Sequence, residues 1–379
     1  MSRKIGMLLP ALLWVCASTV LVSAQSTNSQ TEINPATTGP VAYVYVSSSP
    51  SSGIYQINGY KVASTGRLAA ISGSPFSANG AYYMAVNGKW MFGTSGSNIY
   101  SLSIASNGSL KQVSEVSTNS QDIFNVASLD HTGSTLYAGF LGGSGDNGYD
   151  FYSVNNSTGA LTFIGGAGGG DPDYGYTPIA FIGSNVYGYS SYCALLDPTI
   201  FGFQRSSNGS LSALNILPAM PSGGNYCPYK AAPDTTDHVA VPVWNTNNAQ
   251  NAWQLAVYTA DSSGNLTTTS TSTNMPSISV GSMQDIWTAP SGKILAVGGT
   301  TGLQLFHFNG ANPITPFTTP LIGTEIDQVF WDNAHHLFAL SKAAGKLYVF
   351  TVTSTGATQA AGSPYNIAGA QYLIVLPKT

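Results

Sequence analysis

Short stretches in which apolar and polar residues alternate recur along the chain, and each leads into a turn that contains glycine. Alternation with a period of two is typical of β-strands that bury one face. No segment after the N-terminal apolar run shows a convincing helical period. We therefore predict seven strand–turn units, whose strands are IYQIN (54–58), IYSLSI (99–104), DFYSV (150–154), IFGFQ (200–204), QLAVYT (254–259), LQLFHF (303–308) and KLYVFTV (346–352).

The turns that follow these strands repeat, and the sequence SNGSL occurs twice, at 106–110 and at 207–211. The turn glycines are Gly66, Gly108, Gly159, Gly209, Gly264, Gly310 and Gly356. Their spacings of 42 to 55 residues match the length of a propeller blade. Ser, Asn and Thr side chains bond nearby backbone groups in such turns, and glycine takes the positive φ that a tight hairpin requires.

Between successive turns the chain carries a second pattern, in which an apolar strand, a polar turn and another apolar strand follow one another. Each repeat then holds four antiparallel strands. This second pattern occurs six times, so the seventh blade still lacks a first strand. QYLIVL (371–376) at the end of the chain supplies it by pairing with VAYVYVS (41–47). The prediction is an all-β, seven-bladed β-propeller of four-stranded antiparallel blades. Pairing of the C-terminal strand with the N-terminal strands closes the ring and hides the edges of an open sheet.

The N-terminus has the pattern of a secretory signal. Arg3 and Lys4 precede an apolar run from Ile5 to Val22, and Val22-Ser23-Ala24 offers small residues for cleavage. The alternative is an uncleaved membrane anchor, because the apolar run is nearly long enough to span a bilayer. We expect a signal peptide at 1–24, a flexible segment at 25–39 and one propeller at 40–379. The expected location is secreted or periplasmic, with no stable membrane span after cleavage.

Charge is scarce, at 7% of residues. Removal of residues 1–24 leaves ten basic and 16 acidic side chains, and no basic cluster exists. Nucleic acid is excluded as a partner, because phosphate binding needs concentrated Lys and Arg. We expect a monomer that meets a small sugar-like molecule or a protein.

The segment 68–113 resembles a repeat of the seven-bladed lactonase-like propellers, the family of 6-phosphogluconolactonase and of YVTN-type repeats. GSPF (73–76) is typical of that family, and GSPY recurs at 362–365. The resemblance covers roughly residues 40–379. It implies the fold, and it implies sugar-lactone hydrolysis as one activity among several in the family. Family enzymes are expected to use His, Arg and carboxylates at the channel mouth, and this sequence offers only Arg67 and Arg205, which are poorly placed for that role.

In a propeller, the connections between blades and the second-to-third-strand loops lie on one face, which we call the mouth face. His131, His238, His335 and His336 fall in first-to-second-strand turns on the opposite, far face, and we expect turn or surface histidines there. No Ser–His–Asp or Cys–His arrangement is supported. Asp122, Asp285, Asp327 and Lys230 enter first strands and are predicted to ring the mouth, QDIF (121–124) and QDIW (284–287) being near copies. They are candidates for general acid–base work, or they order the blade junctions by accepting backbone N–H bonds.

Two glycine-rich loops on the mouth face, 142–150 and 165–176, contain four carboxylates, Asp146, Asp150, Asp171 and Asp173. Hard oxygen ligands of this kind suit Ca²⁺, although the spacing does not match an EF-hand. Solvated loop charges are the other interpretation. No other cofactor is predicted.

Cys193 and Cys227 are the cysteines that remain after the signal, and an exported chain with two cysteines suggests one disulfide. The predicted fold brings both to adjacent loops on the mouth face. Several tyrosines belong to the same loops, and three of them, Tyr176, Tyr226 and Tyr229, are candidate ligand contacts. Two functions remain open: a non-catalytic extracytoplasmic binding or scaffold module, and a hydrolase of sugar lactones.

Overall fold

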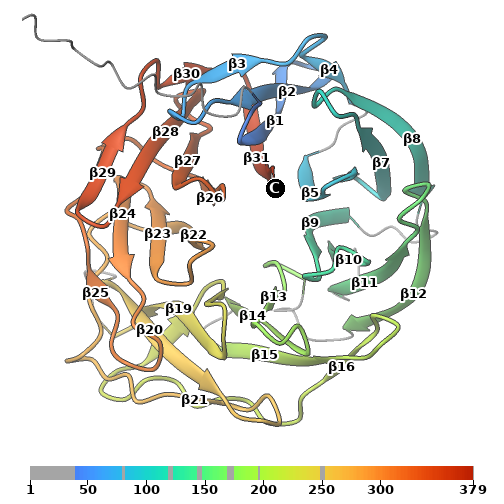
Figure 1. The fold of residues 1–379 in the computed structure, drawn as a ribbon. Coiled ribbons are helices and arrows are strands. Elements are labelled where there is room, and N and C mark those ends of the chain that lie inside the picture. Colours follow the sequence, from blue (N-terminus) through green and yellow to red (C-terminus); the bar gives the residue numbers. More distant parts are fainter. Residues whose placement is uncertain are drawn as a thin grey trace, which may run out of the picture. The chain divides into compact units, whose positions relative to one another are not determined.

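The computed structural model describes residues 39–78, 82–117, 123–142, 147–168, 175–194, 197–247 and 252–378. Every regular element in these ranges is a β-strand, and the strands form seven antiparallel sheets arranged as a ring (Figure 1). The predicted signal at 1–24 and the segment 25–38 lie outside the described residues. Among the described residues, no helix has the length and apolar character needed to cross a membrane.

Each sheet is one blade with its first strand at the channel. Blade 1 contains β31 (Ala370–Pro377), β1 (Ala42–Ser51), β2 (Ile54–Val62) and β3 (Leu68–Ala70), with the short β4 (Phe76–Ser77) beside β2. Blade 2 contains β5 (Tyr83–Asn87), β6 (Trp90–Ser95), β7 (Asn98–Ile104) and β8 (Leu110–Ser117). Blade 3 contains β9 (Ile123–Leu129), β10 (Thr135–Leu141), β11 (Gly148–Val154) and β12 (Leu161–Gly168).

The remaining blades follow the same order. Blade 4 contains β13 (Ala180–Phe181), β14 (Tyr187–Ala194), β15 (Asp197–Arg205) and β16 (Leu211–Ala213). Blade 5 contains β17 (Tyr226–Pro228) and β18 (Ala232–Pro233), which share the first position, then β19 (His238–Asn245), β20 (Trp253–Ala260) and β21 (Leu266–Thr267). Blade 6 contains β22 (Met283–Thr288), β23 (Ile294–Gly299), β24 (Gly302–His307) and β25 (Thr315–Pro316). Blade 7 contains β26 (Gln328–Trp331), β27 (His336–Ser341), β28 (Lys346–Thr353), β29 (Gly356–Gln359) and the short β30 (Tyr365–Asn366).

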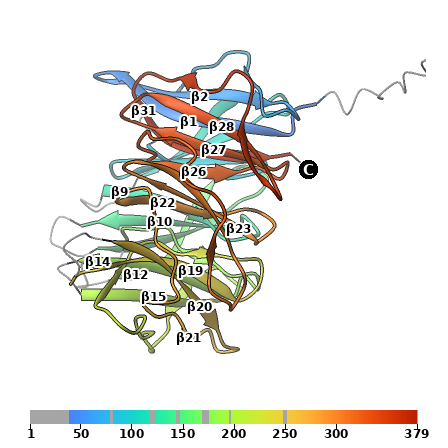
Figure 2. The same ribbon diagram turned by 90° about the vertical axis from the view of Figure 1, so that its left-hand side faces the viewer.

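The ring closes as predicted, because the C-terminal β31 pairs antiparallel with β1 from Ala42↔Pro377 to Ser48↔Ala370. The predicted seven-bladed propeller and its closure are therefore confirmed. In the side view of Figure 2, β31 and β1 lie in one layer and β26 and β27 in the neighbouring one.

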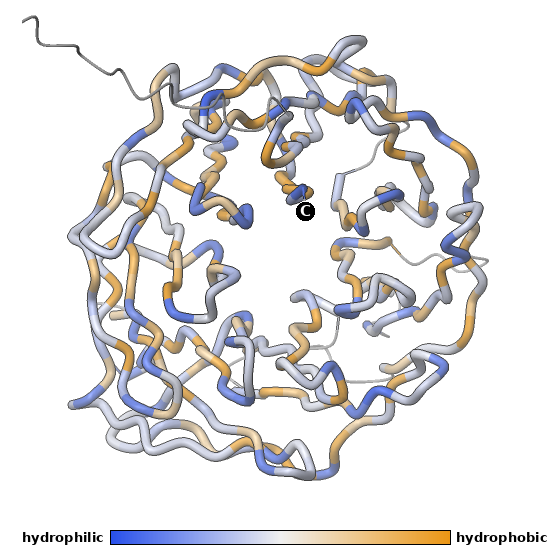
Figure 3. The backbone as a smooth tube through the Cα atoms, viewed as in Figure 1, coloured by the Kyte–Doolittle hydropathy of each residue, from blue (hydrophilic) through white to orange (hydrophobic). Residues whose placement is uncertain are grey.

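The hydrophobic core lies between the blades and not at the centre of the ring. Seven clusters of buried apolar side chains each join two neighbouring blades. One cluster, for example, packs Leu347 and Val349 of blade 7 against Val44 and Val62 of blade 1. Figure 3 shows the same distribution, with hydrophobic positions spread round all the blades. Alternating strands serve this design because each sheet is covered on both faces by its neighbours.

The repeated turn glycines lock one blade to the next on the far face. Gly108 has a φ of 87°, and a Cβ built on it would lie 2.7 Å from the ring of Tyr43 in the preceding blade. The carbonyl of the same glycine accepts a 2.7 Å hydrogen bond from the Tyr45 hydroxyl. In the second SNGSL copy, the carbonyl of Gly209 accepts a 2.8 Å bond from the Tyr137 hydroxyl. Gly108 and Gly209 each need a positive φ and a close approach together, whereas Gly356 has no described neighbour within 4 Å of the place that a Cβ would take.

We expect Gly108→Ala to lower the free energy of unfolding by about 2–3 kcal/mol, because an L-residue at positive φ costs about 1–2 kcal/mol and overpacking against Tyr43 adds to it. Gly53→Ala is the matched control, since Gly53 has a φ of 76° but no atom of the described residues lies within 4 Å of the place that a Cβ would take. Urea unfolding of the two variants measures the difference. Equal destabilisation by both would contradict the blade contact.

The GSPF and GSPY motifs form the same structure in blades 1 and 7. Ser74 Oγ accepts the N–H of Gly59 at 2.9 Å, and Ser363 Oγ accepts the N–H of Val349 at 2.9 Å. The aromatic residue of each motif then begins the short strand β4 or β30. The motif therefore covers the edge of a third strand, which is a structural role and not a catalytic one.

Candidate functional site

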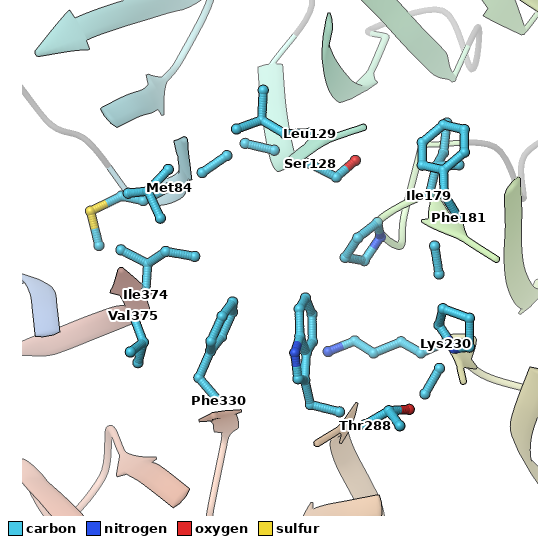
Figure 4. Close-up of a pocket in the computed structure, with 18 of the residues that line it drawn as sticks. Met84, Ser128, Leu129, Ile179, Phe181, Lys230, Thr288, Phe330, Ile374 and Val375 are labelled. Carbon is cyan, nitrogen blue, oxygen red and sulfur yellow. The ribbon is translucent and has the colours of Figure 1, made fainter. Parts of the chain in front are cut away.

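The inner strand of blade 5 is broken at Lys230, between β17 and β18. Lys230 has a φ of 58°, a conformation that non-glycine residues seldom adopt and that often marks a functional position. Its backbone is held by Ser191 of blade 4, which accepts the Lys230 N–H at 3.0 Å and donates its hydroxyl to the Lys230 carbonyl at 2.6 Å. The break directs the Lys230 side chain into the channel (Figure 4).

Lys230 forms an ion pair with Asp285 of blade 6, with 2.7 Å between Nζ and Oδ1. The two side chains are 18% and 12% exposed, so the pair is largely shielded from water. Nζ also donates to the carbonyl of Gln284 at 3.0 Å, and the second carboxylate oxygen of Asp285 accepts the N–H of Val329 in blade 7 at 2.9 Å. Asp285 therefore orders a blade junction and neutralises the lysine, and neither of its oxygens is without a donor.

The contacts continue round the mouth. Strand registers place Lys230, Asp285, Gln328, Tyr372 and Tyr83 at matching positions in five consecutive blades, and we call this set the mouth chain. Gln328 accepts the N–H of Leu373 at 2.7 Å, which repeats the junction that Asp285 makes one blade earlier. The rings of Tyr372 and Tyr83 then meet edge to face at 5.5 Å.

Burial and neighbouring groups keep Lys230, Tyr372 and Tyr83 of the mouth chain protonated at neutral pH, because the pKa of each is raised. Burial alone would lower the pKa of Lys230, but Asp285, the hydroxyls of Tyr229 and Tyr372 and the hydrogen bond to Asp285 raise it overall. Burial, and then the charge of Asp285, raises the pKa of Tyr372 far above that of a free tyrosine. Burial also raises the pKa of Tyr83. The chain thus offers hydrogen-bond donors to a ligand, and Lys230 and the two tyrosines are poor general bases.

A row of aromatic side chains extends outward from Lys230 across blades 4 and 5. Tyr176 and Tyr192 stack with 4.3 Å between ring centroids and 2° between planes, and Tyr192 lies 5.9 Å from Tyr229. Tyr229 meets Trp253 at 6.4 Å, and Trp253 meets Trp244 at 6.3 Å. We call these five residues the aromatic row, and all of them are partly exposed. Their positions before first strands or at second-to-third-strand loops place them on the mouth face.

A disulfide joins Cys193 of β14 to Cys227 of β17, as predicted, with 5.4 Å between the Cα atoms. It ties blade 4 to blade 5 beneath the aromatic row, because Cys193 follows Tyr192 and Cys227 follows Tyr226. Tyr226, predicted as a ligand contact, is only 2% exposed and donates its hydroxyl to Gln254 at 3.2 Å. Its ring packs between the blades. The structure thus places Tyr176 and Tyr229 on the accessible surface and corrects the assignment of Tyr226.

The described ends of the near copies QDIF and QDIW do not occupy the same place in their blades, since Phe124 pairs with Phe140 and Trp287 pairs with Ala296. In blade 6, Asp285 on the first strand pairs with Gly298 on the second. Gly139 is at the equivalent position of the second strand in blade 3, and its partner on the first strand is Val126. The difference is visible in the sequence. Asp285 stands seven residues before Gly292 and Asp122 eleven residues before Gly133, and both glycines belong to first-to-second-strand turns. Asp122 itself lies outside the described residues. Asp327 is one position away from the mouth chain, and its Oδ2 accepts the N–H of Lys342 at 2.7 Å.

The proposed calcium ligands are mostly beyond what the structure describes: Asp146, Asp171 and Asp173 fall outside it. Asp150 lies on β11, and its Oδ2 accepts a 3.1 Å hydrogen bond from Tyr152. No group of three or more His, Cys, Asp or Glu with the geometry of a metal site occurs among the described residues. The calcium site stays a prediction.

The histidines of the far face hold turns in place. His336 Nδ1 lies 2.7 Å from Asp332 Oδ2, and His238 Nδ1 lies 2.8 Å from Asp234 Oδ2. The turn placement is as predicted, but His336 is fully buried and not at the surface. Arg205 forms a 3.0 Å ion pair with Asp130 in the same region, away from the mouth.

Sequence reasoning missed the residues that line the channel below the mouth chain. Trp287 and Phe330 face the channel from blades 6 and 7 and stack with 4.3 Å between ring centroids and 28° between planes. Trp287 follows Asp285 by two positions, so a strand must point both side chains to the same face. This spacing of two residues is the sequence signal that places Trp287 on the channel side of its strand.

Comparison with known proteins supports the fold. No family model matches the sequence, and no curated protein is similar to it. A periplasmic gluconolactonase from Pseudomonas aeruginosa has a similar structure, with a TM-score of 0.66 and 14% identity over 88% of this chain and 99% of that one. Candidate 6-phosphogluconolactonases from Bacteroides uniformis and Bacteroides fragilis give TM-scores of 0.65 and 0.61 at 14% and 13% identity, covering 88% and 90% of this chain and 99% and 100% of theirs. The chain therefore has the fold of the lactonase-like propellers, as its GSPF-type repeats predict, and at this identity the likeness establishes the fold alone.

Proposed function

We propose that this propeller is an extracytoplasmic binding module that takes a neutral saccharide on the aromatic row of its mouth face. The observation that supports this proposal is the aromatic row, in which five partly exposed rings follow one another in contact from Tyr176 to Trp244. Aromatic faces offer a large rigid contact area, and the hydroxyls and indole N–H groups at their edges can bond sugar hydroxyls.

The charge distribution at the mouth supports a neutral ligand. Lys230 and Asp285 cancel each other at 2.7 Å, and the low charge of the whole chain supplies no steering field. The disulfide between Cys193 and Cys227 supports an oxidising location, which agrees with the secretory pattern of residues 1–24. The same disulfide joins the two chain segments that carry Tyr192 and Tyr229, whose rings lie 5.9 Å apart on neighbouring blades.

Calorimetric titration of the mature chain with maltohexaose, cellohexaose and chitohexaose tests the proposal. We expect one of the three to bind, and Trp253→Ala and Tyr192→Ala to weaken that binding about threefold to tenfold, because an aromatic contact contributes about 0.5–1.5 kcal/mol. Phe163→Ala is the control, since Phe163 is an exposed aromatic on the outer strand β12. Absence of binding by all three saccharides, or equal loss in the control, contradicts the proposal.

A second candidate function is hydrolysis of a sugar lactone, favoured by the names of the structural neighbours and by the position of Lys230 and Asp285 at the mouth. In this function Lys230 would donate a hydrogen bond to the lactone carbonyl, and Asp285 would orient the attacking water. The engagement of both Asp285 oxygens argues against a strong base at this position.

The opening of D-glucono-1,5-lactone, followed by acid release, separates the two functions. For a binding module we expect the rate of the buffer alone. A faster rate that disappears in Asp285→Asn, with the fold retained, would establish the hydrolase instead.

A further inference from the structure

The channel below the mouth chain contains a cavity of about 350 Å³, which the saccharide proposal does not use. The inner strands of all seven blades line it, and its size is that of a small-molecule pocket. The aromatic row lies on the outer side of Lys230, and this cavity lies on the inner side. Figure 4 shows Phe330, Ile374 and Lys230 directed into it from three different blades.

The cavity exists because small residues face two large ones. The positions two residues deeper than the mouth chain form a second ring, which we call the deep ring. Its members are Ile374, Ala85, Ser128, Ala180, Ala232, Trp287 and Phe330. Three alanines and one serine leave space that larger residues would fill, and Trp287 and Phe330 form a single aromatic wall on the opposite side.

The aromatic wall is held in place and is accessible. Trp287 lies on β22, and its backbone carbonyl accepts the indole N–H of Trp331 at 3.2 Å. The residue is nevertheless 37% exposed, whereas the neighbouring Trp331 is 4% exposed. A large apolar ring left open inside a channel indicates a contact for a ligand, because its exposure to water is unfavourable. A planar ring fits best, since it can stack on the face of Trp287 that Phe330 does not cover.

The end of the cavity toward the mouth offers a polar anchor. A lysine ammonium carries three N–H donors, and Asp285 and the Gln284 carbonyl take two of those on Lys230. The third can reach an acceptor oxygen. Because Lys230 and Asp285 together carry no net charge, the site does not favour an anion over a neutral molecule.

We propose that the channel is a second ligand site, which binds a small neutral aromatic compound with an acceptor oxygen. The ring stacks on the exposed face of Trp287, which Phe330 supports from behind, and the oxygen accepts a hydrogen bond from Lys230. The site is separate from the saccharide row, so that either ligand can bind without the other.

The test uses 2-naphthol, a planar neutral aromatic at pH 7, titrated into the full mature chain by calorimetry. We expect one molecule bound per chain. Trp287→Leu and Ala180→Leu should each weaken binding at least tenfold, the first by removing the aromatic wall and the second by filling the space opposite to it. Ala180→Leu keeps the aromatic pair, so it remains informative if Trp287→Leu fails to fold. Naphthalene-2-sulfonate should bind no more tightly than 2-naphthol.

Trp253→Ala is the control, because it damages the aromatic row and leaves the channel intact. Binding of 2-naphthol that is lost in Trp253→Ala and kept in Ala180→Leu would place the compound at the mouth and overturn the proposal. Absence of any binding by the wild-type chain would overturn it as well. Neither result depends on whether the hexasaccharides bind, so the two proposals fail independently.

Discussion

A chain that ends at Gly369 is expected to lose its folded monomeric state. The deletion removes β31, whose side chains Leu373, Ile374, Val375 and Leu376 are at most 7% exposed and pack into the clusters on both sides of blade 1. Burial of each contributes about 1.5–3 kcal/mol, and the sum is comparable to the whole stability of a domain, about 5–15 kcal/mol. The deletion also leaves β1 with an unpaired apolar edge, which favours aggregation.

Size-exclusion chromatography and thermal unfolding measure this outcome. Deletion of Lys378 and Thr379 alone is the control, because it removes one described backbone hydrogen bond, from Lys378 to Val41, and keeps the whole strand. A synthetic peptide with the sequence of residues 370–378 should restore part of the stability when added to the shortened chain, since it supplies the missing strand. A shortened chain that stays monomeric with an unchanged melting temperature would show that β31 does not close the ring.

The second large effect is expected from Lys230→Met, which leaves the carboxylate of Asp285 without its cation. Removal of one partner of a buried ion pair costs about 3–5 kcal/mol, because the remaining charge is uncompensated. Asp285→Asn should also destabilise, by leaving the ammonium unpaired, although the amide oxygen can still accept the N–H of Val329. Urea unfolding at pH 7 measures each variant.

The double variant Lys230→Met/Asp285→Asn is expected to be more stable than the sum of the single losses predicts, because it contains neither charge and keeps the acceptor for Val329. Additive losses would mean that the two side chains do not interact in solution. The pKa of Lys230 is raised on folding, so the stability that this group contributes is fully present below the ordinary lysine pKa. That contribution is lost only as the pH rises through the higher pKa of the folded state, and experiments near neutral pH therefore measure the charged lysine.

The two proposed sites lie on opposite sides of the same lysine. The aromatic row approaches Lys230 at its middle member Tyr229, whose ring centroid is 5.5 Å from the Lys230 ammonium, and the cavity begins on the other side of the mouth chain. A ligand in one site thus lies close to the group that anchors the other. Comparison of 2-naphthol affinity with and without a bound hexasaccharide reports whether the sites are coupled.

The placement of Lys230 and Asp285 was predictable in part. Both enter first strands in the sequence, and both reach the mouth chain. Their ion pair was not predictable, because it depends on the φ of 58° at Lys230 and on the twist that brings blade 5 against blade 6. The likeness of QDIF to QDIW does not include their distance from the next turn, and Asp122 stays a prediction because it lies outside the described residues.

Tyr226 and Trp287 show that the sequence does not fix which aromatic side chains are exposed, since the first is buried and the second is exposed. A tyrosine in a mouth-side loop is expected at the surface, and the structure buries Tyr226 because it lies on β17 and packs into the apolar cluster between blades 4 and 5. Trp287 belongs to the QDIW segment that enters a first strand, and the structure exposes it in the channel because small side chains face it from the other blades.

The sequence by itself determined the number of blades, the four strands of each, the closure by residues 371–376 and the pairing of Cys193 with Cys227. The first three follow from period-two alternation and from glycine turns at regular intervals, and both are local. The cysteine pairing follows from the presence of only two cysteines after the apolar N-terminal run. Only the tertiary structure decided which side chains meet in the channel. The inner strand of every blade supplies residues to it. The hydrogen bonds of Asp285 and Gln328 between neighbouring blades join positions 44 to 55 residues apart, whose distance in space depends on the packing of whole sheets.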